Sequence, residues 1–349
     1  MSEEEQIDDE AQEKPEEIPS SLTDLDGLGA VTEKKLKGFG VTSLIDLCIR
    51  GAREIVEITG VAKAKADQWV FQAHNILEDS GAIRNTTMDV LDLMDYHDGY
   101  EKVSTKCKAV DDLIDGGVNP EAVYEVYGEF GSGKTQFCNT LTAEAIKDNH
   151  NVVWIDCEDT FKPKRIAEIL MERGYAVDID DAKKFISNIT YFYTPTTEQL
   201  MGTVNDLSKT LTEKKPKLVI LDGSIGQFRE EYLGRGTQAE RQNQIARLMT
   251  HIKNISFYFR CSVIFTNQVQ SDPSIMFGDP VKPIGGNIVG HASTYRLYFK
   301  KSGRKRIARM VDSPEHPIAD AEFALTAKGI EDKVDGVRIC KANPHEIMC

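Results

Sequence analysis

The amino-acid sequence predicts an α/β fold with a mostly parallel central sheet, preceded by a small all-α domain. Short apolar runs of strand length alternate with amphipathic helical patterns over residues 101–333, as in a sheet that is covered by helices on both faces. The first of these runs leads into a glycine-rich loop that opens a helix. Helical patterns with two glycine-containing turns fill residues 20–78. Together these observations predict the architecture.

The composition indicates a soluble, globular protein. The chain has 349 residues, of which 40% are hydrophobic and 28% charged, and no apolar run reaches the roughly 18 residues that span a bilayer. The acidic N-terminus does not resemble a signal peptide. The seven cysteines are odd in number and form no C-x-x-C pair, which favours a reducing, cytoplasmic environment over a disulfide framework or a zinc site.

The formal net charge of −14 argues by itself against nucleic-acid binding. The charge is unevenly distributed, however, since residues 1–19 contain nine acidic residues and one lysine. We expect these residues to be a disordered acidic tail, and residues 334–349 to be an irregular C-terminal tail. The remaining body is only mildly acidic, so basic groups that converge on one groove could still bind a polyanion.

Residues 20–78 contain two similar turns between helical patterns, Leu25–Gly29 and Ile58–Ala62. This arrangement is typical of a helix-hairpin-helix domain, in which backbone N–H groups at a helix start face a phosphate. Ala62 stands where the second turn would carry its second glycine. The two turns therefore predict either a DNA contact or a packing scaffold.

Residues 79–100 form a polar connector with an apolar core around Val90 and Met94. We expect this connector to be a linker or a short segment that docks elsewhere. Residues 101–333 follow as the α/β core. The strands expected there are Val123–Val126, Val152–Asp156, Leu218–Leu221 and Val263–Thr266, with a helix over 239–252 and a hairpin over 295–309.

The stretch from Gly128 to Thr135 reads GEFGSGKT and fits the pattern G-x-x-x-x-G-K-T. Glycines let such a loop turn its N–H groups toward a β-phosphate, and the helix that follows adds partial positive charge. Lys134 would reach the β- and γ-phosphates, and the Thr135 hydroxyl would bind Mg²⁺. The apolar strand before the loop and the helix after it argue against a chance match. The nucleotide-binding candidates here are Gly128, Glu129, Phe130, Gly131, Ser132, Gly133, Lys134, Thr135 and Gln136.

Polar residues at three other strand ends complete a candidate catalytic site. Asp222 ends a core strand and is a candidate second Mg²⁺ ligand, or a carboxylate that caps a turn. Glu158 could polarise an attacking water, although Asp156 and Asp159 are equally compatible with the spacing. Gln268 could donate a hydrogen bond to a γ-phosphate, or simply cap the strand.

Two loops beside this site have the composition of a polyanion-binding surface. Residues 271–291 are rich in glycine and proline with little regular pattern, as in functional or disordered loops. Arg229, Arg235 and Arg241 recur at intervals of six around two glycines. Arginines on flexible loops suit a nucleic-acid backbone. The alternative for each arginine is an ordinary surface position that is either solvated or paired with a nearby acidic residue.

The chain resembles the archaeal RadA recombinases and their eukaryotic relatives, in the RecA superfamily, over almost its whole length. The resemblance rests on GEFGSGKTQ, EDTFKPKRI, FREEYLGRG, AERQ, TNQV and IGGNIVGHA, which occur in this order. It implies a RecA-like core, with ATP and Mg²⁺ as cofactors and Glu158 as general base. It also implies that Arg165 stacks on adenine and that Gln268 couples the γ-phosphate to DNA.

The same resemblance assigns the loops and a subunit contact. Residues 229–241 would be the first DNA-binding loop and 271–288 the second, with Arg229, Arg235, Arg241, Gly285, Gly286 and Asn287 as DNA-binding candidates. Pro314 and Asp320 would cap the ATP of a neighbouring subunit in a filament or ring. The implied location is the nucleoid in the cytoplasm.

The sequence departs from the family pattern in three places. The segment usually written IDTEGTFRPERI is IDCEDTFKPKRI here, with changes at Cys157, Asp159, Lys162 and Lys164. Gly223 and then Ser224 follow the strand aspartate, where a serine or threonine is common. The connector lacks the Phe-x-x-Ala-like plug that normally anchors one subunit to the next. The matching positions are Thr87–Val90, where Met88 with Leu91 is the candidate substitute.

Three functions are compatible with this sequence. The first is an ATP-dependent recombinase that assembles on single-stranded DNA and exchanges strands with a homologous duplex, with recombination mediators as possible further partners. The second is a paralogue or mediator that binds DNA or recombinase without exchanging strands, which the missing plug favours. The third is a related ATPase that acts on proteins, which the helix-hairpin-helix pattern and the GGNIVGHA segment disfavour.

Overall fold

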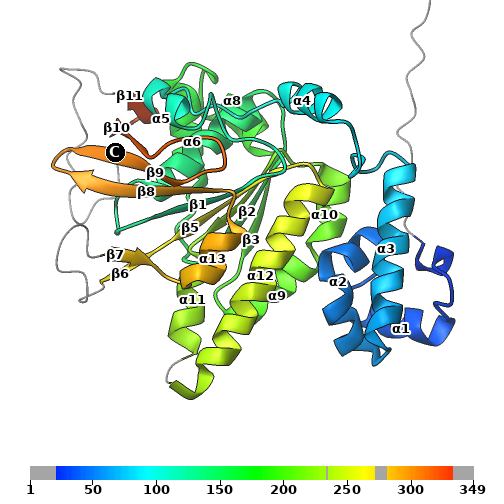
Figure 1. Ribbon diagram of the computed structural model, residues 1–349. Helices are drawn as coiled ribbons and strands as arrows, with labels where there is room; N and C mark the ends of the chain where they lie inside the picture. The colour runs from blue at the N-terminus through cyan, green and yellow to red at the C-terminus, as the bar shows by residue number, and fades with distance from the viewer. Residues whose placement is uncertain (1–20, 233–234, 272–280, 333–349) are drawn as a thin grey trace, which may run out of the picture.

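The computed structural model describes residues 21–232, 235–271 and 281–332. Its centre is a nine-stranded sheet in the order β11-β10-β9-β8-β1-β5-β4-β2-β3 (Figure 1). The strands are β1 (Val123–Gly128), β2 (Val152–Asp156), β3 (Ile189–Tyr193), β4 (Leu218–Asp222), β5 (Ser262–Asn267), β8 (Tyr295–Ser302), β9 (Lys305–Asp312), β10 (Ala319–Thr326) and β11 (Gly329–Asp332). The strands from β8 to β3 in this order pair in parallel, and β9, β10 and β11 extend the sheet in antiparallel fashion. The predicted α/β class, the four predicted strands and the β8–β9 hairpin are confirmed.

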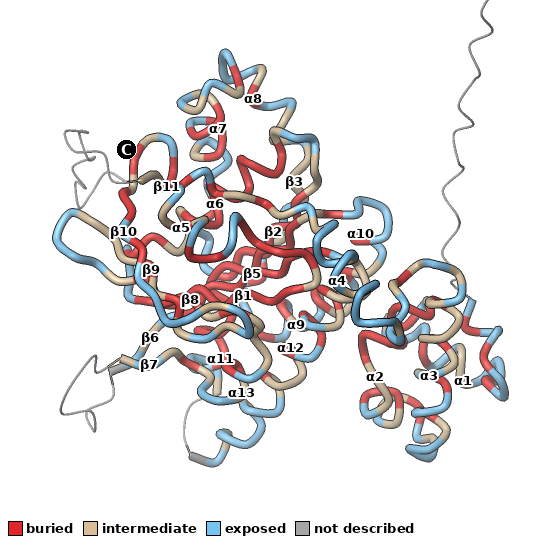
Figure 2. Tube along the Cα trace, turned by 45° about the horizontal axis from the view of Figure 1, so that its top comes forward, coloured by how far each residue is buried: buried red, intermediate tan, exposed pale blue. Residues whose placement is uncertain are grey.

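Helices cover both faces of the sheet (Figure 2). One layer contains α5 (Lys108–Leu113), α6 (Lys134–Lys147), α7 (Pro163–Glu172) and α8 (Ile179–Ile186). The other contains α9 (Thr197–Asn205), α10 (Leu207–Lys214), α11 (Ser224–Glu231), α12 (Gln238–Tyr258) and α13 (Gly286–Ala292), with the 3₁₀ turn η2 (Arg235–Thr237) before α12. Alternate strand residues serve opposite layers. Trp154 and Ile220 belong to one core, and Ile155 and Leu221 to the other, as expected for strands that are buried on both faces.

The N-terminal helices are η1 (Leu22–Asp24), α1 (Ala30–Gly38), α2 (Leu44–Thr59) and α3 (Lys63–Asp79). The predicted turns immediately precede α1 and α3. The first turn packs against α3, because Lys65 Nζ and Trp69 Nε1 both donate to the Asp26 carbonyl, at 2.8 and 3.0 Å. These helices are compatible with the predicted helix-hairpin-helix domain. Whether their turns contact DNA stays a prediction.

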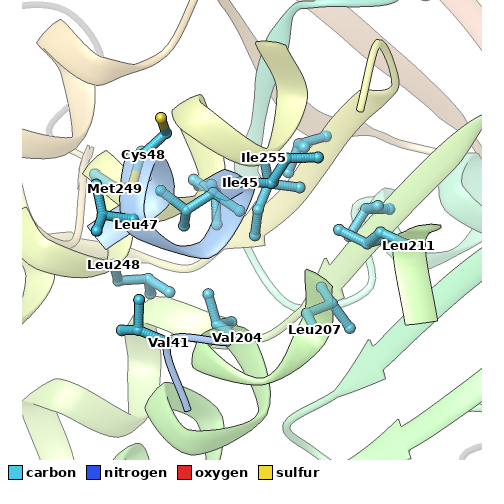
Figure 3. Close-up of a cluster of buried hydrophobic side chains, with 14 of the residues drawn as sticks. Val41, Ile45, Leu47, Cys48, Val204, Leu207, Leu211, Leu248, Met249 and Ile255 are labelled. Atoms are coloured by element: carbon cyan, nitrogen blue, oxygen red, sulfur yellow. The ribbon is translucent and has the colours of Figure 1, made fainter. Parts of the chain in front are cut away.

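The N-terminal helices share a hydrophobic core with the sheet domain (Figure 3). Apolar residues from the α2 region pack against residues of α9, α10 and α12; the labelled members are Val41, Ile45, Leu47, Cys48, Val204, Leu207, Leu211, Leu248, Met249 and Ile255. Polar contacts surround this core. Glu54 lies 2.6 Å from the buried His251 Nε2 and 3.2 Å from Arg247 Nε. The domain is therefore docked by both apolar and ionic contacts.

The connector contains a helix that the sequence did not predict, α4 (Val90–Asp98). The buried Glu121 carboxylate holds it, accepting hydrogen bonds from the hydroxyls of Tyr96 and Tyr100. Val90 is 72% exposed and Met94 57% exposed. These side chains therefore face solvent, and whether the segment docks elsewhere stays a prediction. None of the helices in the described ranges is long and apolar enough to cross a membrane.

Candidate active site

The parallel sheet brings the candidate catalytic residues to one edge. Gly128 ends β1, Asp156 ends β2, Asp222 ends β4 and Asn267 ends β5. These four strands are adjacent in the sheet and run in the same direction, so their carboxyl ends meet. Glu158 and Gln268 follow two of them by one or two residues. This edge is where ligands bind in open α/β sheets.

The glycine loop adopts a conformation that requires its glycines. Gly128 has φ of 157°, and a Cβ atom there would lie 2.0 Å from the Phe299 carbonyl oxygen. Gly133 has φ of 108° and is the N-cap of α6. The N–H groups of the first turn of α6 have no acceptors within the helix, and they carry partial positive charge. The loop therefore presents donors to an anion, as the sequence predicts.

Lys134 is a partly buried ammonium held inside the loop. Its Nζ donates to the carbonyl oxygens of Gly128 at 2.9 Å and Glu129 at 3.1 Å. Burial lowers the pKa of Lys134, and the negative charges of Asp222 and Glu158 partly oppose this shift. A buried cation without a direct ion pair is costly. The arrangement is suited to receive an anionic ligand such as a phosphate.

Thr135 and Asp222 form an oxygen pair that fits Mg²⁺. The Thr135 hydroxyl donates to Asp222 Oδ2 at 3.0 Å, and the Thr266 hydroxyl donates to Oδ1 at 2.5 Å. Asp222 is only 3% exposed, and burial raises the pKa of its carboxyl group. No group of three or more His, Cys, Asp or Glu side chains in the described ranges could hold a metal. The remaining Mg²⁺ ligands would therefore be phosphate and water oxygens, which is the usual pattern for this ion.

The geometry distinguishes the three carboxylates that the spacing left equivalent. Asp156 is fully buried and accepts the backbone N–H groups of Glu158 and Phe161, at 3.1 and 2.9 Å, so it shapes the turn. Asp159 is exposed and has a left-handed backbone. Glu158 Oε1 instead accepts a hydrogen bond of 2.8 Å from Gln268 Nε2. Only Glu158 therefore lies against the other candidate catalytic residue.

Gln268 joins this site to the base of the second loop. Its carbonyl oxygen accepts the Ile284 N–H at 3.1 Å. The strands β6 (Val269–Ser271) and β7 (Val281–Pro283) pair antiparallel directly after it. The sequence did not predict this small sheet, because both strands are short and one contains proline. Residues 272–280 of the expected loop lie outside the described residues.

Gly285, Gly286 and Asn287 lie where β7 leads into α13. Gly285 has φ of 95°, and a Cβ atom there would lie 2.3 Å from Val289 Cγ2. Gly286 has φ of 61° and begins the helix. The two glycines therefore make the tight turn that carries Asn287 at the start of α13. Their predicted contact with DNA stays a prediction.

The first loop connects α11 to α12. Arg229 is exposed in the last turn of α11, and Arg241 is half-buried in α12. Neither has an ion pair within the described residues, although acidic neighbours are present. The Glu231 carboxylate accepts a hydrogen bond of 2.8 Å from the Thr197 N–H. The salt-bridged alternative is therefore not supported for these two arginines, whereas the solvated alternative stays open. The side chain of Arg235 lies outside the described residues.

Arg165 lies beside the glycine loop, whereas Pro314 and Asp320 do not. Arg165 Nε donates to Gln136 Oε1 at 2.9 Å, and its Nη2 donates to the Thr326 carbonyl at 2.6 Å. Asp320 forms a two-point ion pair with Arg309, at 2.6 and 2.7 Å. Strand β9 runs antiparallel to β8, so it leads away from the glycine loop, and Pro314 follows its far end. Pro314 therefore lies away from the glycine loop of its own chain, and the nucleotide contact of Pro314 and Asp320 stays a prediction.

Two basic residues that were not predicted from the sequence lie at the glycine loop. Arg306 Nε donates to the Gly131 carbonyl at 3.1 Å. A Cβ atom on Gly131 would lie 3.1 Å from Lys301 Nζ. The signal was the basic run KKSGRKR, which was interpreted only as a hairpin. Its proximity to the loop follows from the parallel pairing of β8 with β1, which places Phe299 opposite Gly128.

Comparisons with known proteins agree with this geometry. Residues 100–333 match the Rad51 family. The chain is 40% identical over 318 residues to the DNA repair and recombination protein RadA of Cenarchaeum symbiosum (strain A). The alignment covers 89% of this chain and 79% of that relative. It therefore includes most of both proteins.

Proposed function

Because the chain belongs to the Rad51 family, we propose that it is an ATP-dependent recombinase of DNA repair and recombination. In this proposal it assembles on single-stranded DNA and pairs that strand with a homologous duplex. The observation that carries the proposal is the 2.8 Å contact between Gln268 and Glu158. This contact links the candidate hydrolytic carboxylate to the strand that opens the second loop. A nucleotide-dependent DNA affinity requires such a link.

The candidate residues have distinct roles in ATP hydrolysis. Lys134 and the N–H groups of the glycine loop bind the β- and γ-phosphates. Thr135 and Asp222 hold Mg²⁺, which neutralises phosphate charge when bound. Glu158 orients the attacking water and accepts its proton. Gln268 then exchanges its hydrogen bond between Glu158 and the γ-phosphate, so that loss of this phosphate changes the position of the second loop.

The proposed assembly is a homo-oligomer, either a filament or a ring. Pro314 supports it, because it is exposed and follows the end of β9 that points away from the chain's own glycine loop, and Asp320 is exposed as well. Helix α4 supports it too, since Val90, Leu91 and Met94 expose an apolar face. We propose this face as the substitute for the missing plug. DNA as the substrate implies a nucleoid location in the cytoplasm.

Strand exchange with the purified protein tests the proposal. With ATP, Mg²⁺, single-stranded DNA and a homologous duplex, joint molecules should form. Electron microscopy with an ATP analogue should show helical filaments on the single strand. Protein that binds single-stranded DNA but makes no joint molecules would refute strand exchange.

The second candidate function is a mediator that binds DNA or recombinase without exchanging strands. The observation that favours it is the absence of the Phe-x-x-Ala-like plug at Thr87–Val90. Arg229, Arg235 and Arg241 of the first loop argue against a mediator that binds only recombinase, because such a protein would not need a polyanion-binding loop. Sizing on single-stranded DNA separates the two functions. A mediator would remain small with the ATP analogue, whereas a recombinase would form long assemblies.

Alanine at Arg229 or Arg241 should weaken binding to single-stranded DNA by about 3- to 30-fold at moderate salt, since each loses one phosphate contact. The affinity for ATP should not change. The slope of the logarithm of the DNA-binding constant against the logarithm of salt concentration should also become shallower by about one, as expected for the loss of one phosphate contact. Fluorescence anisotropy over a salt series measures both quantities. Arg53→Ala is the control, because Arg53 is exposed and paired with Glu57 in the N-terminal helices. If both loop variants bind DNA normally, the first-loop assignment is wrong.

The Mg²⁺ requirement of ATP turnover should increase as the pH falls from neutral to mildly acidic values. Metal binding requires the Asp222 carboxylate, and burial raises the pKa of this group. Protons therefore compete with Mg²⁺ at a higher pH than they would at an exposed aspartate. Turnover measured against Mg²⁺ concentration at several pH values tests this. Asp222→Asn should need more Mg²⁺ throughout and lose the pH dependence; an unchanged pH dependence would exclude Asp222 as the titrating ligand.

A further inference from the structure

Helix α11 is a direct connection between the candidate active site and the first loop. It begins immediately after Asp222 and Gly223 and carries Arg229 in its last turn. Its first half contacts both remaining catalytic candidates. A Cβ atom on Gly223 would lie 2.5 Å from Glu158 Cγ, and one on Gly226 would lie 3.7 Å from Gln268 Nε2. Any displacement of α11 therefore reaches both residues.

Gln227 attaches this helix to the segment that carries Glu158. Its side chain is buried, at 7% exposure. Its Nε2 donates to the carbonyl oxygen of Cys157 at 2.9 Å and to that of Thr194 at 2.6 Å. Cys157 directly precedes Glu158, and Thr194 directly follows β3. Both N–H groups of one amide are therefore used to connect α11 to the ends of two strands.

The two hydrogen bonds also define what this position requires. Both partners are carbonyl oxygens, so the side chain must donate twice. Gln227 Oε1 has no hydrogen-bond partner in the described part of the chain, which means that the donors alone hold the amide. Side chains of similar length without the amide nitrogen would leave both carbonyls without this donor. A buried carbonyl oxygen without a donor costs free energy. The segment that carries Glu158 would therefore be less stable in its observed position.

We propose that Gln227 is a positioning residue that couples the first DNA loop to ATP hydrolysis. When DNA binds Arg229 and its neighbours, α11 is held in one position, and the Gln227 amide transmits this position to the Cys157–Glu158 peptide. Glu158 is then held at the distance from the γ-phosphate that hydrolysis requires. This route is separate from the Gln268 contact with the second loop. The inference rests on the proposed ATPase function.

Gln227→Met and Gln227→Glu test the proposal. Methionine keeps the length and the apolar packing, and glutamate keeps the shape without the two donors. At saturating ATP, the DNA-stimulated kcat of both variants should fall by about 10- to 100-fold, as expected when a catalytic group is misplaced by about 1 Å. The KM for ATP and the turnover without DNA should change much less. For Gln227→Glu, kcat should partly recover as the pH falls, because a protonated carboxyl can donate one of the two bonds.

Gln199→Met is the matched control, because Gln199 is an exposed glutamine on the neighbouring α9. It should behave as the wild type. If both Gln227 variants keep the wild-type ratio of DNA-stimulated to basal turnover, Gln227 is merely structural and the inference is overturned. A wild-type protein whose ATP turnover does not respond to DNA would instead contradict the proposed function itself. Thermal unfolding of each variant separates a loss of coupling from a loss of folded protein.

Discussion

Replacing Lys134 by alanine should reduce ATP turnover by at least about 100-fold, because a preorganised cation that stabilises transition-state charge is lost. In the structure the ammonium is partly buried in the glycine loop, and among the described residues it donates to the Gly128 and Glu129 carbonyls. A bound triphosphate would therefore interact directly with the positive charge of Lys134. Nucleotide affinity should decrease together with the rate. Turnover and fluorescent-nucleotide binding measure the two effects.

The folded state should tolerate this change well. Burial lowers the pKa of Lys134, which means that the ammonium is less favourable in the folded protein than in water. Its removal should leave the Tm unchanged or slightly higher. Lys147→Ala is the control, because Lys147 ends the same helix and is paired there with Asp148 at 2.6 Å. Wild-type turnover in the Lys134 variant would exclude this site for ATP.

Glu158→Gln should separate nucleotide binding from hydrolysis. Loss of a general base typically costs about 10²- to 10⁴-fold in rate, while the loop and metal ligands that bind ATP remain. Glutamine also keeps an oxygen that can accept the Gln268 hydrogen bond. The variant should therefore bind ATP and assemble on DNA but fail to release it. Turnover and the lifetime of the DNA complex after ATP addition measure these effects.

Asp159→Asn is the matched control for this experiment. Asp159 is adjacent and exposed, and within the described part of the chain its side chain has no hydrogen bond or ion pair with the catalytic candidates. Its loss should change the rate little. If Asp159→Asn abolishes turnover while Glu158→Gln does not, the roles of the two carboxylates are reversed. Asp156 is unsuitable as a control, because it organises the backbone of the whole turn.

The sequence predicted the centre of the sheet because burial on both faces leaves a continuous apolar pattern. Val152–Asp156 and Leu218–Leu221 are of this kind, and every residue in them is buried. Strand β10 was not predicted, because exposed and buried residues mix along it. Helix α4 was missed for a different reason. Its stability depends on Tyr96 and Tyr100 reaching Glu121, which no local pattern reveals.

The residues of the candidate site also divide into those that a local sequence pattern predicts and those that it does not. Residues that follow a glycine loop or end an apolar strand, such as Lys134 and Asp222, could be predicted from the chemistry of their neighbours. Spacing could not distinguish Glu158 from Asp156. The distinction depends on which carboxylate accepts the backbone N–H groups of the turn, and only the structure shows this. Gln227 gave no signal at all. A glutamine in a helix becomes informative only when its two acceptors, far away in sequence, are known.

The docking of the N-terminal helices has a consequence for how the chain reaches its native state. Glu54 contacts His251 across 197 positions of sequence, and Asn254 contacts the Cys48 carbonyl across 206. During synthesis the α2 region leaves the ribosome long before α12 exists. The apolar residues that pack on α12 must remain uncovered until then, and contacts of such long range form slowly. Completion of α12 is therefore expected to be the step at which this face of the α2 region stops being available for aggregation.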